Sequence, residues 1–576
     1  SHYMDKKIII YQLLPRLFTN TCTDCVPFGT IEQNGVGKLN HINNKVLKEI
    51  KSLGITHIWY TGIIEHATQT DYSNYGIRPH NSYIVKGKAG SPYAISDYYD
   101  IDPDLAENVP QRMSEFEALV TRTHDNGMKV IIDFVPNHVA REYYSDCMPD
   151  GVEQLGAKDD KEKHFDANNN FYYIPRQRFS PRFFIGQNTP NEYNEFPAKA
   201  TGNDKFDAYP SNNDWYETVK LNYGVDYLAW GAQHFDPIPD TWHKMLHILL
   251  FWCGKGVDAF RCDMAHMVPV DFWHWAIAQV KSQYPHIQFI AEIYEPSLYR
   301  PYIEWGLFDY LYDKVGLYDK LRAVECHDVS AAQLSYCWQS LDGLSDHMLN
   351  FLENHDEQRF ASIQYAGNAS RVLPSLIVSA TMSKAPMMIY FGQELGENAD
   401  DAEGFSGRDG RTTIFDYWSV PSVRAWYNEG KCNTSRLTPE QRELRKMYKQ
   451  VLTLCNKEKA IVQGSFFDLM YVNCENQQFD PHRQYTYLRY THNEIILIAV
   501  NFDNKACDVA INIPQHALDM IGIESDKYQA VELLSNTSDE KYLHKAIPFT
   551  TSIAAHGAVL WKIKLTQKTS SSMRKK

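Results

Sequence analysis

The chain has 576 residues, of which 44% are hydrophobic and 22% are charged, and this length exceeds what one hydrophobic core usually holds, so we expect two or three globular domains. The formal net charge of −14 gives no positive surface of the kind that binds nucleic acid. No apolar run reaches ~18 residues, so no membrane-spanning helix is predicted.

The eleven cysteines are odd in number and scattered, which favours reduced thiols and a cytoplasmic location over a disulfide framework. Cys22 and Cys25 form one C-x-x-C, but no second ligand pair follows at zinc-finger spacing, so a metal or redox role is the lesser alternative. No signal peptide is visible after Met4. Because three residues precede Met4, a secreted or periplasmic protein whose signal was removed stays an open alternative.

Short apolar runs alternate with helical patterns up to about residue 430. Near-continuous apolar strands are typical of a parallel sheet that is covered on both faces. Helix signals separate these runs: Ser114 and Glu117 predict a capping box, and Gly127 is placed to end that helix. The pattern predicts an α/β protein with a (β/α)8 TIM barrel. The clearest strand candidates are residues 57–62, 130–135, 289–293 and 387–392.

The barrel is predicted over residues 5–138 and 226–435, with two further parts. Residues 139–225, rich in Asn, Asp, Pro and aromatic residues, are too many for a structureless loop and predict a subdomain inserted after the third strand. Short strand-like runs in 440–566 predict an antiparallel β-sandwich. The polar, basic segment 567–576 is expected to be a disordered tail.

Polar side chains close several of the apolar runs. In "GVDAFRCD" at 256–263, Arg261 and Asp263 stand two residues apart and so point to one side of a strand. Burying these charges is costly, so they form either a structural ion pair or part of a catalytic site. Active sites of (β/α)8 barrels lie at the carboxyl ends of the strands. Four strand ends, interpreted as successive, carry Asp133, Asn137 and His138; Arg261 and Asp263; Glu292; and His355 and Asp356.

Cleavage of a glycosidic bond explains this set of side chains. It needs one ionised carboxylate as nucleophile and one protonated carboxyl that donates to the leaving oxygen. We expect Arg261 to keep Asp263 ionised as the nucleophile. Glu292, at the end of the next strand, is the expected acid/base, with a pKa raised by burial or by a neighbouring negative charge.

Four short segments, "DFVPNH", "FRCDMAHM", "AEI" and "FLENHD", occur in an order that resembles the alpha-amylase family, glycoside hydrolase family 13, over roughly residues 5–430. The resemblance implies retention at an α-linked glucoside of an oligo- or polysaccharide substrate. It assigns Asp263 as nucleophile, Glu292 as acid/base and Asp356 as transition-state stabiliser. It also implies that Arg261, His138 and His355 bind the sugar, that Tyr93 stacks beneath it, and that Asp133 and Asn137 support the site.

The sequence departs from the family pattern where calcium usually binds. Asn222 stands where calcium-binding members usually have Asp, and the segment 34–39 lacks acidic residues. His266 and Met267 replace a Lys-His pair that many amylases carry, and Gly62 stands where Pro is frequent. Calcium requires several oxygen ligands and only Asn137 of the usual set is present, so we expect no metal or other cofactor, with a calcium site elsewhere as the lesser alternative.

Three functions stay open at this point. The first is hydrolysis of α-glucans or malto-oligosaccharides. The second is transfer on the same scaffold, since "GSPYAI" and "HMVPVDFWHW" also resemble the maltosyltransferase branch, although that branch lacks "ENHD". The third is a non-catalytic carbohydrate-binding protein, which the three retained carboxylates disfavour. The sequence does not distinguish α-1,4 from α-1,6 linkages or endo from exo action, and it leaves the oligomeric state open.

Overall fold

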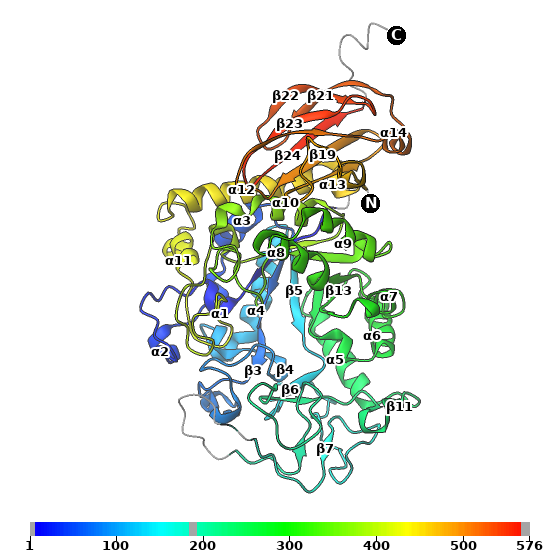
Figure 1. Ribbon diagram of the computed structural model, residues 1–576. Coiled ribbons are helices and arrows are strands. Elements are labelled where there is room, and N and C mark those ends of the chain that lie inside the picture. The colour runs from blue at the N-terminus through cyan, green and yellow to red at the C-terminus, as the bar shows by residue number, and fades with distance from the viewer. Residues whose placement is uncertain (1–5, 182, 184–192, 566–576) are drawn as a thin grey trace.

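A computed structural model describes residues 6–181, 183 and 193–565 (Figure 1). Eight parallel strands close into a barrel in the order β1-β16-β15-β14-β13-β12-β5-β2, which confirms the predicted TIM barrel. The strands are β1 (Ile9–Leu13), β2 (His57–Tyr60), β5 (Lys129–Phe134), β12 (Ala259–Cys262), β13 (Gln288–Ala291), β14 (Tyr310–Tyr312), β15 (Met348–Phe351) and β16 (Met387–Tyr390).

Amphipathic helices cover the outside of the barrel. In α5 (Asp240–Cys253) the residues at helical spacing Trp242, Met245, Leu249 and Trp252 are all buried. Further helices of this layer are α3 (Asn44–Ser52), α4 (Arg112–Asp125), α6 (Val270–Gln283) and α10 (Leu373–Thr381). Within the described part of the chain, no helix is long and apolar enough to cross a membrane.

The start of α4 differs from the sequence prediction. The helix begins at Arg112, directly after the 3₁₀ turn η5 (Val109–Gln111), and Ser114 lies inside it, where its hydroxyl donates to the Gln111 carbonyl (2.8 Å). The prediction of a capping box at Ser114 was therefore wrong, because the helix already begins at Arg112, directly after the preceding turn. The end was predicted correctly: Gly127 follows the helix with φ of 75°.

A short strand that the sequence patterns did not predict lies between β13 and β15. This strand, β14, has only three residues and is followed by Asp313. Such a run is shorter than the four to eight residues from which a strand can be identified by pattern. The strand ends that carry Glu292 and Asp356 are therefore separated by β14 and are not successive, which corrects the sequence interpretation.

The insertion after the third barrel strand, β5, contains short antiparallel pairs. They are β6 (His138–Ala140) with β9 (Thr218–Lys220), β7 (Tyr173–Ile174) with β8 (Ala198–Lys199), and β10 (Val225–Asp226) with β11 (Ala232–Gln233). Figure 1 shows this part below the barrel, beyond the carboxyl end of β5. The limits 139 and 225 stay predictions, because β6 continues directly from the strand end and β10 lies at the other border.

The C-terminal part forms antiparallel sheets, as predicted, after the helices α12 (Pro439–Lys457) and α13 (Lys459–Val462). It lies at the opposite end of the barrel from the insertion (Figure 1). Six strands pair as β17-β18-β19-β24-β21-β22 and two as β20-β23. Their bounds are β17 (Ser465–Asp468), β18 (Gln484–Tyr490), β19 (Glu494–Asn501), β20 (Cys507–Ile511), β21 (Asp526–Glu532), β22 (Thr537–Leu543), β23 (Phe549–Ile553) and β24 (Gly557–Lys564). The predicted tail 567–576 lies outside the described residues.

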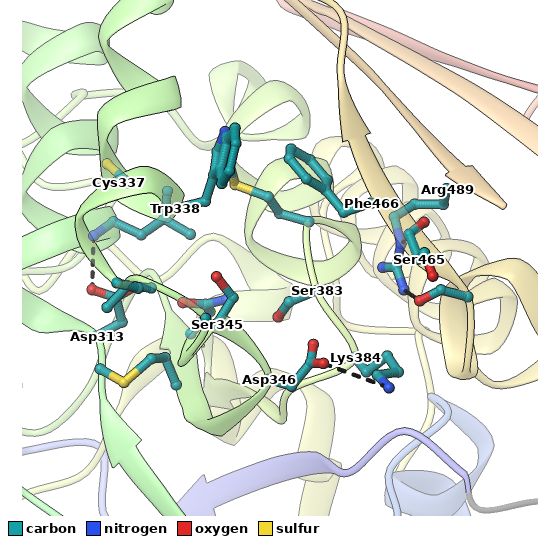
Figure 2. Close-up of a pocket in the computed structure, with 17 residues that line it drawn as sticks. Asp313, Cys337, Trp338, Ser345, Asp346, Ser383, Lys384, Ser465, Phe466 and Arg489 are labelled. Carbon is teal, nitrogen blue, oxygen red and sulfur yellow. Dashed lines mark hydrogen bonds and ion pairs between the residues drawn. The ribbon is translucent and has the colours of Figure 1, made fainter. Parts of the chain in front are cut away.

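A cavity of about 270 Å³ lies between the barrel and the C-terminal sheets (Figure 2). Trp338 and Phe466 contribute side chains from its two sides, and the buried Arg489 of β18 donates to the carbonyl oxygen of Gly464 (2.8 Å). Asp346 and Lys384 pair at 3.5 Å. The residues that line this cavity include none of the predicted site residues, so it belongs to the seam between the two parts.

Candidate active site

A second cavity, of about 510 Å³, lies at the carboxyl end of the barrel and is lined by six of the nine predicted site residues, with Arg261, Asp133 and Asn137 outside its lining. Asp263 follows β12, Glu292 follows β13, and Asp356 comes five residues after β15. β12 and β13 are hydrogen-bonded neighbours, so the two principal carboxylates come from adjacent strand ends, as predicted. The predicted residues that line the cavity are Tyr93, His138, Asp263, Glu292, His355 and Asp356.

Arg261 bridges the two principal carboxylates from beneath. Its Nη1 donates to Asp263 Oδ1 (2.8 Å), its Nη2 lies 2.9 Å from Glu292 Oε2, and its side chain is 1% exposed. Its Nε donates to the Tyr312 hydroxyl (3.0 Å), a contact the sequence did not predict because it depends on the short strand β14. The ion pair and the catalytic cluster are thus one arrangement. Arg261 holds both carboxylates in position for chemistry.

The net pKa shift of Asp263 is opposite to the expectation. Burial, and next the charge of Glu292, raise the pKa of Asp263 well above its usual range, and they outweigh the ion pair with Arg261. Arg261 alone was expected to keep this carboxyl ionised, but it is shared with Glu292. Burial and the neighbouring negative charge therefore favour the protonated form of Asp263 in this cavity.

Both oxygens of Glu292 have hydrogen-bond donors. Oε1 accepts from the backbone N–H of Met264 (2.9 Å), and Oε2 accepts from the Tyr294 hydroxyl. Tyr294 also lines the cavity and was not predicted from the sequence. The available signal was its position two residues after Glu292, which directs both side chains to the same side of an extended chain.

His138 lies beside Asp263 as a neutral imidazole. Its Nε2 is 4.0 Å from Asp263 Oδ2, and its Nδ1 is 3.1 Å from the amide nitrogen of Asn137. Burial, and next the charge of Lys220, lower the pKa of His138 to about 3. An uncharged imidazole in this position can hydrogen-bond a sugar hydroxyl, and Asn137 fixes the orientation of its ring.

His355 and Asp356 lie on another side of the cavity. His355 Nδ1 is 2.9 Å from Gln12 Nε2 and its Nε2 is 3.2 Å from Asp356 Oδ2. Although burial opposes ionisation, His355 and then Arg261 lower the pKa of Asp356 to about 2, so this carboxylate is charged. The Asp356 side chain is 44% exposed at the mouth of the cavity. Gln12, which the sequence analysis missed, was signalled by its place in the apolar run "IIIYQLL".

Asp133 supports the floor of the site. It pairs with Arg261 in the register of β5 and β12, and the closest approach of their charged atoms is 3.6 Å. Its two oxygens accept from Trp59 Nε1 (3.0 Å) and from the Tyr93 hydroxyl (3.1 Å). The Tyr93 ring stacks on His355, with ring centres 5.1 Å apart. Asp133 therefore positions the aromatic ring that was expected to lie beneath the sugar.

A lysine occupies the side-chain oxygen of Asn137, the candidate calcium ligand that the sequence retains. Lys220 Nζ lies 2.6 Å from Asn137 Oδ1 and 2.7 Å from Asp204 Oδ1, and the lysine side chain is 2% exposed. Asn222 is also engaged, because its amide donates to the carbonyl oxygens of Asp166 and Asn169. A divalent cation and this ammonium group cannot share these ligands, so the residues present do not fit a calcium ion at this place.

Within the described ranges, one other group of potential metal ligands gathers, formed by Asp97, Asp100 and Cys147. Arg112 already neutralises Asp100 through three hydrogen bonds, Nε to Oδ1 (2.8 Å), Nε to Oδ2 (3.0 Å) and Nη2 to Oδ2 (2.7 Å). Asp97 accepts from the Ser145 hydroxyl (2.6 Å). These carboxylates therefore have protein partners, and a guanidinium supplies the positive charge.

We expect the protein to keep its activity and melting temperature after prolonged EDTA treatment, because Lys220 supplies the positive charge inside the insertion. Lys220→Met should lower stability by about 1–3 kcal/mol, since Asn137 loses its buried donor. Thermal unfolding of both proteins, with and without calcium, measures this. Lys205→Met, which removes an exposed partner of Asp207 (3.5 Å), is the control and should change stability little. A calcium-dependent rise in the melting temperature of the wild type would contradict the expectation.

Comparison with protein families agrees with this geometry. The model of the alpha-amylase catalytic domain matches residues 12–464, which is most of the chain. The chain belongs to the alpha-amylase family. The family model ends at the border of β17, so the C-terminal sheets lie outside the matched region.

Individual relatives of the amylase-family chain are distant. A cyclomaltodextrinase of Geobacillus thermopakistaniensis is 21% identical over 515 residues, which cover 87% of this chain and 70% of that protein. An alpha-1,4-glucan:maltose-1-phosphate maltosyltransferase of Rhodospirillum rubrum is 25% identical over 424 residues, or 72% of this chain and only 48% of that protein. Relatives at this identity include both hydrolases and transferases.

The fold is shared with solved structures. An alpha-amylase from Geobacillus thermoleovorans, complexed with acarbose, superposes with a TM-score of 0.61 at 18% identity, covering 98% of this chain and 99% of that one. At this level of identity the likeness concerns the fold alone. The chemistry of this chain therefore rests on its own residues.

Proposed function

We propose that the protein is a retaining α-glycoside hydrolase that acts on α-glucans or malto-oligosaccharides through a covalent glycosyl-enzyme intermediate. The observation that carries the proposal is the bridge by which Arg261 joins Asp263 and Glu292 at adjacent strand ends, with distances of 2.8 and 2.9 Å. Carboxyl groups held by one guanidinium are close together, as in retaining enzymes, whereas inverting enzymes separate them to admit a water molecule.

Each carboxyl group then has a separate role. Asp263 in its ionised form attacks the anomeric carbon, and Glu292 transfers a proton to the leaving oxygen. In the second half of the reaction Glu292 accepts a proton from water, which releases the sugar from Asp263. Asp356, with its lowered pKa, supplies a fixed negative charge close to the positive charge that develops on the sugar ring.

A transglycosidase on the same scaffold is the second candidate. It has the same covalent intermediate and differs only in whether water or a sugar takes the glycosyl group. The distant relationship to a maltosyltransferase supports keeping this alternative. A non-catalytic binding protein is disfavoured because Asp263, Glu292 and Asp356 are all present and line one cavity.

The configuration and size of the first products test the proposal. With maltotriose as substrate, NMR should detect the α-anomer of the new reducing sugar before mutarotation, because two displacements at one carbon restore its configuration. A β-anomer formed first would exclude the covalent mechanism. Oligosaccharides longer than maltotriose at early times would show transfer. Products no longer than maltotriose throughout would favour the hydrolase.

A further inference from the structure

An ion pair that the mechanism does not use lies in the wall of the active-site cavity. Lys86 follows η3 (Ser82–Ile84) and Glu217 directly precedes β9, and Lys86 Nζ lies 3.1 Å from Glu217 Oε2. Both side chains line the cavity, and they are 15% and 7% exposed. A buried ion pair is weak evidence for stability by itself. The place of this ion pair in the lining of the active-site cavity indicates a role in binding.

This pair keeps hydrogen-bonding capacity for a ligand. Glu217 Oε2 is buried against Lys86, so the other carboxylate oxygen, Oε1, is the one available to accept from a ligand in the cavity. An ammonium group has three donors, so the single ion pair leaves Lys86 able to donate further. The Tyr216 ring, 5.2 Å from Lys86 Nζ, and the close packing of Gly87 against the Phe415 carbonyl hold the lysine in place.

The chemistry of this wall fits a neutral sugar unit. The carboxylate accepts and the ammonium donates, which matches two neighbouring hydroxyl groups, and their charges cancel. Trp215 lines the same wall and supplies a flat apolar surface beside them. A charged ligand would leave one member of the pair without compensation.

The position of the pair relates it to the glycone, the part of the substrate that is transferred. Trp215 packs on His138 with ring centres 5.3 Å apart, and His138 Nε2 lies 4.0 Å from the nucleophile. The leaving group, in contrast, departs toward Glu292, which protonates it and which Tyr294 contacts. The pair thus adjoins the His138 side of the cleavage site.

We propose that Lys86, Glu217 and Trp215 form a subsite for the second sugar unit of the glycone, the unit joined to the one that Asp263 attacks. This inference rests on the proposed retaining mechanism and adds a substrate preference to it. The enzyme should recognise a maltosyl group better than a glucosyl group, because only the former fills the subsite.

Two chromogenic substrates test the inference, 4-nitrophenyl α-maltoside and 4-nitrophenyl α-glucoside. The wild type should prefer the maltoside. Glu217→Gln and Lys86→Met should each lower kcat/KM for the maltoside by about 10- to 100-fold, mainly through KM, because a hydrogen bond to a charged group is lost. Both variants should leave kcat/KM for the glucoside within about twofold. Trp215→Ala should show the same selectivity for the maltoside.

The matched controls remove an ion pair of the same kind outside the cavity. Lys255 Nζ and Glu117 Oε1 are 2.7 Å apart, and Glu117→Gln and Lys255→Met should change neither rate. Equal losses on both substrates, or no loss on the maltoside, would overturn the subsite. The wild type reports separately on the proposed function, through α-configured first products. If it cleaves neither substrate, calorimetry of maltose and glucose binding to the same variants decides, since only maltose affinity should fall.

Discussion

Asp263→Asn is expected to lower kcat by several orders of magnitude while the protein stays folded. The amide is nearly the same size as the carboxylate and can still accept from Arg261, so the buried cluster keeps its packing. The amide cannot form the covalent bond to the anomeric carbon, and within the described residues no ion pair joins another carboxylate to His138. The measurement is kcat on maltotriose with purified, folded protein.

The comparison needs a control and a chemical assignment. Asp346→Asn makes the same change at the exposed pair with Lys384, which lies outside the active-site cavity, and should keep full activity. A fluorinated maltosyl donor, which forms the intermediate but releases it slowly, should label the peptide that contains Asp263 in the wild type. The role assignment fails if Asp263→Asn retains more than about a tenth of kcat, or if the label is found on another carboxylate.

The positions of the principal carboxylates were predictable because they depend on local pattern. Arg261 and Asp263 follow an apolar run with a spacing of two, and parallel strands bring Glu292 beside them. Asp356 and the two histidines followed from the order of short motifs. The closed barrel followed from alternating strand and helix signals, with the exception of the three-residue strand β14.

Contacts between segments that are distant in the chain could not be predicted in this way. Gln12 reaches His355 across 343 positions, and Lys220 reaches Asn137 across 83. The sequence shows that Arg261 stands two residues from Asp263, but it does not show that Glu292 shares the guanidinium. The expectation that Arg261 alone would favour the ionised form of Asp263 was therefore wrong, because the pKa also depends on burial and on this second carboxyl group.

The insertion illustrates the same limit for function. Its composition predicted a subdomain but gave no indication that Glu217 would face the cavity, because Lys86, its partner, lies 131 positions earlier. The missing calcium ligands were visible in the sequence, whereas the replacement of the cation by Lys220 was not. Charge compensation inside a fold is a property of three-dimensional neighbours, which composition does not encode.

Glu292→Gln should lower kcat on maltotriose by about 10²- to 10⁴-fold, the usual contribution of a general acid/base, with its backbone contact to Met264 retained. Because 4-nitrophenolate leaves without protonation, the first step should be much less impaired on the 4-nitrophenyl maltoside. Azide, which needs no general base, should then accelerate release and yield the α-glycosyl azide, since it attacks the intermediate on Asp263. A β-glycosyl azide would exclude that intermediate.

The pH profile of the same variant gives the second half of the test. In the wild type kcat/KM should be bell-shaped, with limbs that belong to the Asp263–Glu292 pair. With the 4-nitrophenyl substrate the variant should lose the basic limb, because no proton has to be donated. Its acidic limb should move to lower pH, because the charge of Glu292 is one of the causes that raise the pKa of Asp263 and the substitution removes it. A basic limb that persists would identify another group as the acid, and an unmoved acidic limb would show that the two carboxyl groups are not coupled.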